Sequence, residues 1–436
     1  MADVNRYNAA PSFPHQRVSA GTTTPVSVTD RLHWARRNGH PAYVWPDVPI
    51  AQWRSSLEAI EAVVARILIS DPVPPTPVPC LVPPLGADAR AVGIASFTSG
   101  TGPLLGRWVE EGRLQVPPDL ADILAQHLAH GRRRAVRLRA MLHGALDALS
   151  AQGVHAIVLK GAHTGSVYFP EPGTRPAADI DLGVRPEQVA AASVAMSRLG
   201  YVPRVQHTRP HRCDWVMPGV GPPTSLDLSH EENPVSIEVH AGLDRNYGVR
   251  RLSFSPYDAS HTAPWIEYGV ALVPTQPLLF AYLAAHASEE LHRIQLLRLI
   301  ELVLVARRDF TSPAHWSALR ELVRTLEAGR FLYPAVALAA RFVPGSIDAG
   351  TLAEMAADAP QRMRDVVARL QPATAQRLEG LSIAERFIWA RGPIEIVKHA
   401  AYLLWPARSR SLGTIYAERL WRVLRGRISL GSGGRD

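Results

Sequence analysis

Two short segments of the chain, one near residue 180 and one near residue 238, alternate acidic or polar side chains with apolar ones. The first carries Asp179 and Asp181, and the second carries Glu238 and His240. Successive side chains of a strand point to opposite faces, so each segment predicts a strand with one buried face and one polar face. If the two strands lie side by side, their three carboxylates converge.

Converging carboxylates predict a metal site. Like charges held close together repel, whereas hard divalent cations such as Mg²⁺ or Mn²⁺ take oxygen ligands of this kind. We therefore predict Asp179, Asp181 and Glu238 as metal ligands and catalytic residues. Asp214 and Asp227 also stand in alternating segments, so either remains an alternative to Glu238.

A phosphate-binding element is predicted upstream of these carboxylates. The apolar run 155–159 predicts a buried strand, and Lys160 and Gly161 follow it at the start of a helix-like segment. Glycine permits close backbone approach, and helix N-terminal amides attract anions. Lys160 adds a positive charge, and Arg175 is expected to clamp a phosphate with two hydrogen bonds. Gly165 is a second candidate, but we expect it to lie inside the helix.

The pattern around these motifs divides the chain into four regions. Residues 1–49 are rich in Pro, Ser, Thr and Gly and are expected to be disordered or loosely attached. Residues 50–151 predict an N-terminal helical region, 152–275 an α+β core, and 276–436 a C-terminal helical domain. Pro and Gly separate the segments within these regions.

Individual elements follow from periodicity and from helix-breaking residues. We predict helices at 50–70 and 186–199, and an extended linker at 71–84, which contains seven prolines. Amphipathic helices are expected between 120 and 151, with a break near Gly131. The segment 415–430 predicts a basic amphipathic helix that packs on the protein itself, the alternative being contact with a membrane or nucleic acid.

Several of these motifs together resemble a known family. Leu-Lys-Gly, Tyr-Phe-Pro followed by Arg, Asp-Ile-Asp-Leu and Ile-Glu-Val-His are similar to the uncharacterised bacterial nucleotidyltransferase family of the DNA polymerase beta-like superfamily, over about residues 85 to 310. The superfamily's usual Gly-Ser or Gly-Gly pair is replaced here by Lys160-Gly161, as in this family. The resemblance implies an α+β, polymerase-beta-like nucleotidyltransferase core, a small mixed sheet with helices, flanked by helical regions.

The resemblance also implies an activity and further site residues. A nucleoside monophosphate would pass from a nucleoside triphosphate, such as ATP, to an unknown acceptor with release of pyrophosphate. Polar residues of the later helices would lie near the nucleotide, which adds Arg298 to the nucleotide-binding set and makes His286 a candidate. His240, on the same strand as Glu238, joins the nucleotide-binding set as a partner of the metal-binding carboxylates. The structural alternatives stay open, because Arg298 and Glu301 are three residues apart and can pair on one helix face, and His240 can pair with a carboxylate.

Two other functions use the same motifs. A glycosyltransferase with a nucleotide-sugar donor needs the same grip on metal and diphosphate, and a non-catalytic nucleotide-binding or regulatory protein keeps the site without the reaction. The acceptor is expected to be a small molecule, peptide or protein. RNA is the weaker alternative, because the chain lacks an aromatic-and-basic RNA-reading motif.

Composition limits the class of protein further. The formal charge of +8 suits an anionic partner such as a nucleotide. Two cysteines, Cys80 and Cys213, build neither a disulfide framework nor a cysteine-rich zinc site. No apolar stretch is long enough to cross a bilayer, and the N-terminus lacks the pattern of a secretory signal, so we expect a cytoplasmic protein.

Overall fold

The computed structural model describes residues 48–404, apart from gaps at 74–75, 205–211, 220–232, 258–260, 266, 268–270, 290, 292–293 and 373–386. The chain divides into two compact units, residues 1–389 and 390–436. In the second unit the structure describes helix α15 (Pro393–Leu404). The predicted helix at 415–430, Asp227 and nearly all of the predicted N-terminal tail lie outside the described residues.

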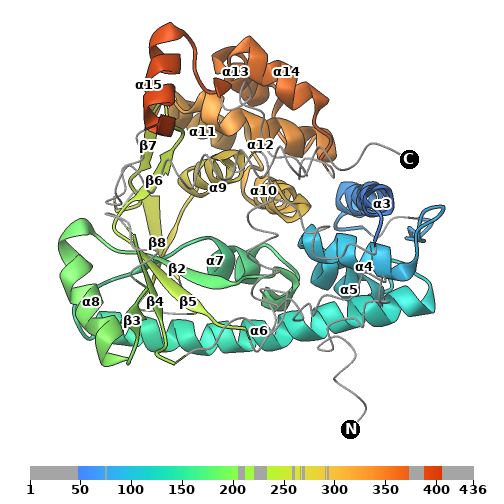
Figure 1. Ribbon diagram of the computed structural model, residues 1–436, viewed down its shortest axis with the longest axis horizontal. Helices are drawn as coiled ribbons and strands as arrows, with labels where there is room; N and C mark the ends of the chain where they lie inside the picture. The colour runs from blue at the N-terminus through green and yellow to red at the C-terminus, as the bar shows by residue number, and fades with distance from the viewer. Residues whose placement is uncertain are drawn as a thin grey trace, which may run out of the picture. The chain divides into compact units, whose positions relative to one another are not determined.

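Within the described residues, seven strands form a mixed sheet in the order β3-β4-β5-β2-β1-β9-β8 (Figure 1). The central strands β2 and β5 run parallel, and both of their outer neighbours, β1 and β4, are antiparallel to them. A separate hairpin pairs β6 (Leu243–Asn246) with β7 (Arg251–Phe254). The bounds of the sheet strands are β1 (Ile157–Val158), β2 (Asp179–Gly183), β3 (Val202–Pro203), β4 (Arg212–Val216), β5 (Ser236–His240), β8 (Thr262–Pro264) and β9 (Leu272–Pro274). The α+β prediction is confirmed.

The apolar face of the central strands packs on two helices. Ile180 and Leu182 of β2 and Ile237 of β5 are fully buried. They share a core cluster with Leu142 and Leu146 of the long helix α6 (Pro118–Ser150) and with side chains of α8 (Val189–Arg198). Because side chains alternate along a strand, this packing turns the acidic residues of β2 and β5 to the other face of the sheet.

A second core joins the two ends of the folded chain. The early helices α3 (Ile50–Ser70), α4 (Ala89–Thr98) and α5 (Gly102–Glu110) share one apolar cluster with the later helices. The side-chain amide of Gln295 donates a hydrogen bond to the carbonyl of Thr98 at 3.1 Å. The backbone N–H of Leu297 donates to the carbonyl of Ser99 at 3.1 Å. The later helices are α9 (Leu278–Glu289), α10 (Leu296–Asp309), α11 (Pro313–Thr325), α12 (Gly329–Phe342), α13 (Ala349–Asp358) and α14 (Gln361–Arg369).

These layers place the middle of the sheet between two helical layers. Figure 1 shows α6 along one side of the sheet and of the short helix α7 (Lys160–Val167), with α9 and α10 on the other side. Gly165 lies inside α7, as predicted. None of the described helices combines the length and apolar character that a bilayer-spanning helix needs.

The predicted break near Gly131 is wrong, because α6 continues through it from Pro118 to Ser150. At this point the short 3₁₀ turn η2 (Pro172–Thr174) crosses the helix so closely that a Cβ on residue 131 would lie 2.2 Å from the carbonyl oxygen of Gly173. Glycine is therefore required by a backbone crossing and does not interrupt the helix. The helix predicted at 186–199 begins as a 3₁₀ turn and becomes α-helical at Val189.

Candidate active site

Three acidic side chains lie in one row across the middle of the sheet. Asp181 on β2 is in register with Glu238 on β5, and Glu238 is in register with Asp214 on β4. All three residues are only 4–7% exposed. Asp179 stands two residues before Asp181 on the same face of β2. The structure thus brings together Asp181 and Glu238, and adds Asp214 beside them.

Positive side chains offset these buried charges. The Lys160 ammonium donates to Oδ1 of Asp181 at 2.8 Å. Arg212 donates to Glu238 Oε1 at 2.7 Å and to Asp214 Oδ1 at 2.8 Å. Buried carboxylates without such partners would be strongly destabilising. The Arg212 guanidinium thus bridges Asp214 and Glu238. In the sequence, Arg212 could have been found from its position two residues before Asp214, which places both side chains on the same strand face.

Asp181, Glu238 and His240 form a group that fits a divalent cation. One potential ligand atom from each residue lies within 4.8 Å of the others. His240 Nε2 lies 2.9 Å from Asp181 Oδ1 and 3.5 Å from Glu238 Oε2. Two carboxylates and an imidazole are ligands that Mn²⁺ accepts, and Mg²⁺ binds through one or two carboxylates together with substrate phosphates. Asp179 does not belong to this compact group, although it stands on the same face.

The pKa values of the two aspartates of β2 are shifted in opposite directions. Burial opposes ionisation of Asp181, but the charge of Lys160 and the His240 hydrogen bond outweigh it and hold the pKa of Asp181 well below its usual value. Burial, reinforced by the charges of Asp181 and Glu238, raises the pKa of Asp179 to about 6. The strand therefore carries one firmly ionised carboxylate and one whose ionisation is costly.

The raised pKa of Asp179 predicts how stability depends on pH. The folded pKa of about 6 lies above the ordinary value of 3.8, so the folded state is favoured while the carboxyl is protonated. Stability is therefore lost as the pH rises from 3.8 to about 6. In EDTA at pH 8 we expect Asp179→Asn to be more stable than the wild type by about 1–3 kcal/mol. At pH 4.5 the difference should fall to roughly a third of its pH 8 value, because the folded carboxyl is then protonated while the unfolded one is still mostly ionised. Thermal melts at both pH values test this, and a lower melting temperature of the variant at pH 8 would contradict it.

Lys160 begins α7 in an unusual backbone conformation. Its φ of 42° lies in the left-handed region, which costs a residue with a side chain roughly 1–2 kcal/mol. Its ion pair with Asp181 offsets this cost and holds the ammonium over the carboxylates. Strain of this kind is concentrated at functional sites. At the next residue, Gly161, a Cβ would lie 2.6 Å from Nη1 of Arg175, so glycine admits the arginine side chain here.

Arg175 and Arg298 both reach Glu301 on α10. Arg175 Nε donates to Glu301 Oε1 at 2.7 Å, and Arg298 lies 3.5 Å from Oε2. Thr164 of α7 donates a further hydrogen bond to Glu301. Burial disfavours the Glu301 carboxylate, but Arg175 and Arg298 prevail and lower its pKa to about 2. Arg298 thus forms the ion pair with Glu301 that was the structural alternative to nucleotide binding. Arg175, predicted as a phosphate clamp, instead pairs with Glu301 and links the segment before β2 to α10.

A further cation, Arg245 of β6, interacts electrostatically with Asp181 and contacts α9. Arg245 donates to the Tyr282 hydroxyl at 2.7 Å and lies over its ring. His286, one turn further along α9, is held neutral: burial and then the charges of Arg245, Lys160 and Arg298 lower its pKa well below the usual value. A neutral histidine among cations is a place where an added anion is stabilised. No sequence pattern indicated Arg245, which stands outside any motif.

A buried arginine of α6 holds the beginnings of both carboxylate strands. Arg134 is 1% exposed and donates to the carbonyl of Ala178 at 2.6 Å and to that of Pro234 at 3.1 Å. It also donates to the carbonyls of Ala177 and Asn233. One guanidinium therefore fixes β2 against β5 immediately before Asp179 and close to Glu238.

Comparison with known proteins assigns the family. A profile of the family described as uncharacterised nucleotidyltransferase matches residues 88–344, more than half of the chain. The chain belongs to this family. The nucleotidyltransferase match runs from α4 to the end of α12, so it includes the carboxylate strands, Lys160 and the Glu301 ion pair. No curated protein and no solved structure matched the chain.

Proposed function

We propose that the protein is a metal-dependent nucleotidyltransferase that moves a nucleoside monophosphate from a nucleoside triphosphate to an acceptor and releases pyrophosphate. The observation that carries the proposal is the compact group of Asp181, Glu238 and His240 on adjacent strands, with Lys160 bound to it. The family assignment supports the same chemistry. Residues 152–275 are proposed as a polymerase-beta-like core.

The buried carboxylates fit Mg²⁺ or Mn²⁺, with Asp181 and Glu238 as ligands and Asp179 or His240 completing the set. When bound, the ion supplies positive charge that offsets the charge of the donor phosphates. In the proposed reaction the acceptor oxygen bonds to the α-phosphorus, while the bond between the α-phosphorus and the oxygen that bridges the α- and β-phosphates breaks. Pyrophosphate leaves, and the acceptor's proton passes to water.

The cationic side chains Lys160 and Arg245 are proposed to orient the donor, together with the neutral His286. Lys160 lies beside the carboxylates. Arg245 of β6 and His286 of α9 are close enough to interact electrostatically with Lys160. Positive groups fixed in a site of low polarity stabilise charge that develops on the leaving group. Arg175 acts indirectly in this account, because Glu301 engages its guanidinium and thereby fixes α7 against α10.

Product analysis tests the proposed reaction. Purified full-length protein is incubated with Mg²⁺ or Mn²⁺, each nucleoside triphosphate and a small-molecule cell extract as the acceptor source. We expect pyrophosphate release that EDTA abolishes, and Glu238→Gln should reduce it strongly. In parallel reactions with UDP-glucose and GDP-mannose, release of a nucleoside diphosphate would instead favour glycosyl transfer. Nucleotide binding without any product would contradict catalysis and favour a regulatory role.

A further inference from the structure

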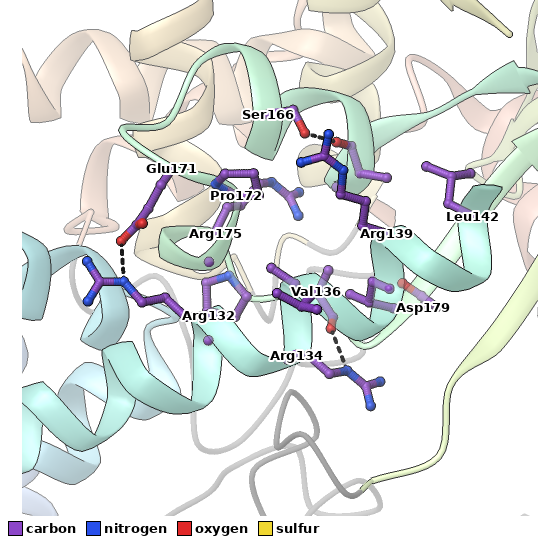
Figure 2. A pocket seen from close by; sticks show the side chains of 18 residues that line it. Arg132, Arg134, Val136, Arg139, Leu142, Ser166, Glu171, Pro172, Arg175 and Asp179 are labelled. Atoms are coloured by element: carbon purple, nitrogen blue, oxygen red, sulfur yellow. Dashed lines mark hydrogen bonds and ion pairs between the residues drawn. The ribbon is translucent and has the colours of Figure 1, made fainter. Parts of the chain in front are cut away.

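A pocket of about 230 Å³ lies beside the carboxylate strand, between α6, α7 and the turn at residues 171–177. Figure 2 shows α6 forming one wall, Ser166 of α7 opposite, and Glu171 and Asp179 toward opposite ends. Gly161, Arg175 and Asp179 all line it, so the pocket reaches three of the residues predicted for the active site. Its volume is below the range of about 300–1,000 Å³ typical of sites for drug-sized ligands.

The wall of the pocket is mainly apolar. It includes side chains of Val136, Leu138 and Leu142 from α6, together with Ala162 and Pro172. Such a wall favours a compact apolar group over a heavily hydrated one.

The arginines that line the pocket already have partners. Arg132 is bound to Glu110 and Glu171, and Arg139 is paired with Glu267. Arg134 is engaged by the strand carbonyls described above. Arg175 is paired with Glu301. Each guanidinium of the wall therefore has hydrogen-bond partners within the protein, and an occupant need not supply a negative charge.

The pocket lies on the α6 side of the site, away from Arg245 and His286. Among the residues that the structure describes, its lining comes from positions 131–179 and includes none from β6, α9 or α10. Figure 1 shows α6 and α9 on opposite sides of α7 and the central strands. Asp179 lines this pocket and also stands on the same strand face as Asp181, so the pocket meets the carboxylate site at Asp179.

We infer that this pocket binds the acceptor, a small uncharged molecule or side chain with a compact apolar body and a hydroxyl group directed at Asp179. The inference rests on the proposed nucleotidyl transfer and specifies its second substrate. The acceptor hydroxyl supplies the oxygen that bonds to the α-phosphorus, its proton is lost to water, and pyrophosphate departs as the bond between the α-phosphorus and the α,β-bridging oxygen breaks.

Ligand-observed NMR with phenol and cyclohexanol tests the pocket, with glycerol as a hydrophilic comparison. Val136 is 71% exposed, so Val136→Trp can cover the pocket without disturbing the core. Val194→Trp is the matched control, because Val194 is 44% exposed on α8 and does not line the pocket. We expect both probes, and not glycerol, to bind wild type and Val194→Trp, and Val136→Trp to weaken binding at least tenfold. Equal binding to all three proteins, or none to wild type, would overturn the inference.

A second measurement tests whether the pocket adjoins the metal site. Replacing Mg²⁺ with paramagnetic Mn²⁺ should broaden the resonances of bound phenol in wild type, and Asp181→Asn should abolish this broadening. Unbroadened phenol would overturn the acceptor assignment. Calorimetry with Mg²⁺-ATP on the same proteins separates the two proposals: Val136→Trp should bind ATP as wild type does. Wild type that binds phenol but no nucleotide would instead contradict the proposed function.

Discussion

Asp181→Asn is expected to reduce nucleotidyl transfer by about 10²–10³-fold, as removal of one fixed electrostatic group from an active site typically does. Asp181 contacts two other residues of the site: its Oδ1 accepts a hydrogen bond from Lys160 at 2.8 Å and lies 2.9 Å from His240 Nε2. The amide keeps the shape of the side chain but loses the negative charge that would hold a divalent cation. Initial rates of pyrophosphate release at saturating Mg²⁺ measure the effect.

Asp214→Asn is the matched control for that variant. Asp214 is also a buried strand aspartate in the same row, but it does not belong to the compact group and contacts Arg212. We expect its loss of rate to be at least tenfold smaller than that of Asp181→Asn, with both variants showing wild-type circular dichroism. Equal losses would mean that Asp214 holds the metal as well, and loss in Asp214→Asn alone would contradict the assignment of the site.

Arg134→Met is expected to lower the free energy of unfolding by about 3–5 kcal/mol, since it leaves several buried carbonyls without their charged donor. These carbonyls belong to the residues immediately before β2 and β5, including Ala178 and Pro234. The same change should weaken Mg²⁺-dependent nucleotide binding, because Asp181 and Glu238 depend on the alignment of the two strands. Urea denaturation measures the first effect and calorimetry the second.

Arg133→Met provides the comparison on the same helix. Arg133 is the exposed neighbour of Arg134, and its replacement should change stability by less than about 0.5 kcal/mol. Arg134→Lys should fall between the two, because one ammonium cannot reach all four carbonyls. Unfolding curves of Arg134→Met and Arg133→Met that coincide would show that the buried guanidinium does not hold the strands together.

The local elements of the core could be predicted because their patterns are short-range. Alternation around Asp181 and Glu238 indicated two strands with one polar face, and the structure has β2 and β5 there in parallel register. The order of neighbours in the sheet was not predictable, since β5 and β2 are separated by more than fifty residues of chain. The family resemblance supplied that juxtaposition, which alternation alone left conditional.

The partners of buried charges could not be read from spacing. Arg175 has the position expected of a phosphate clamp, yet it pairs with Glu301, which is 126 residues away in sequence. Arg245 reaches the site from a hairpin that carries no motif. Such pairs depend on which helices pack together, and the cost of burying an unpaired charge is a property of the folded site.

Gly131 illustrates the same limit for the backbone. Glycine within a helical pattern lowers helix propensity, which predicted a break. The structure instead has a continuous helix of 33 residues, because the glycine accommodates the close crossing of the turn that contains Gly173. The low helix propensity of Gly131 was outweighed by a tertiary contact with Gly173, which is more than forty residues away in sequence.

Calorimetric titration of ATP into the full-length protein, with Mg²⁺ and with EDTA, tests the central claim most directly. Wild type should bind ATP in the presence of Mg²⁺, and the double variant Asp181→Asn/Glu238→Gln should lose this binding while Asp214→Asn retains it. Binding of equal strength in EDTA, or binding that survives in the double variant, would contradict a metal site formed by these carboxylates.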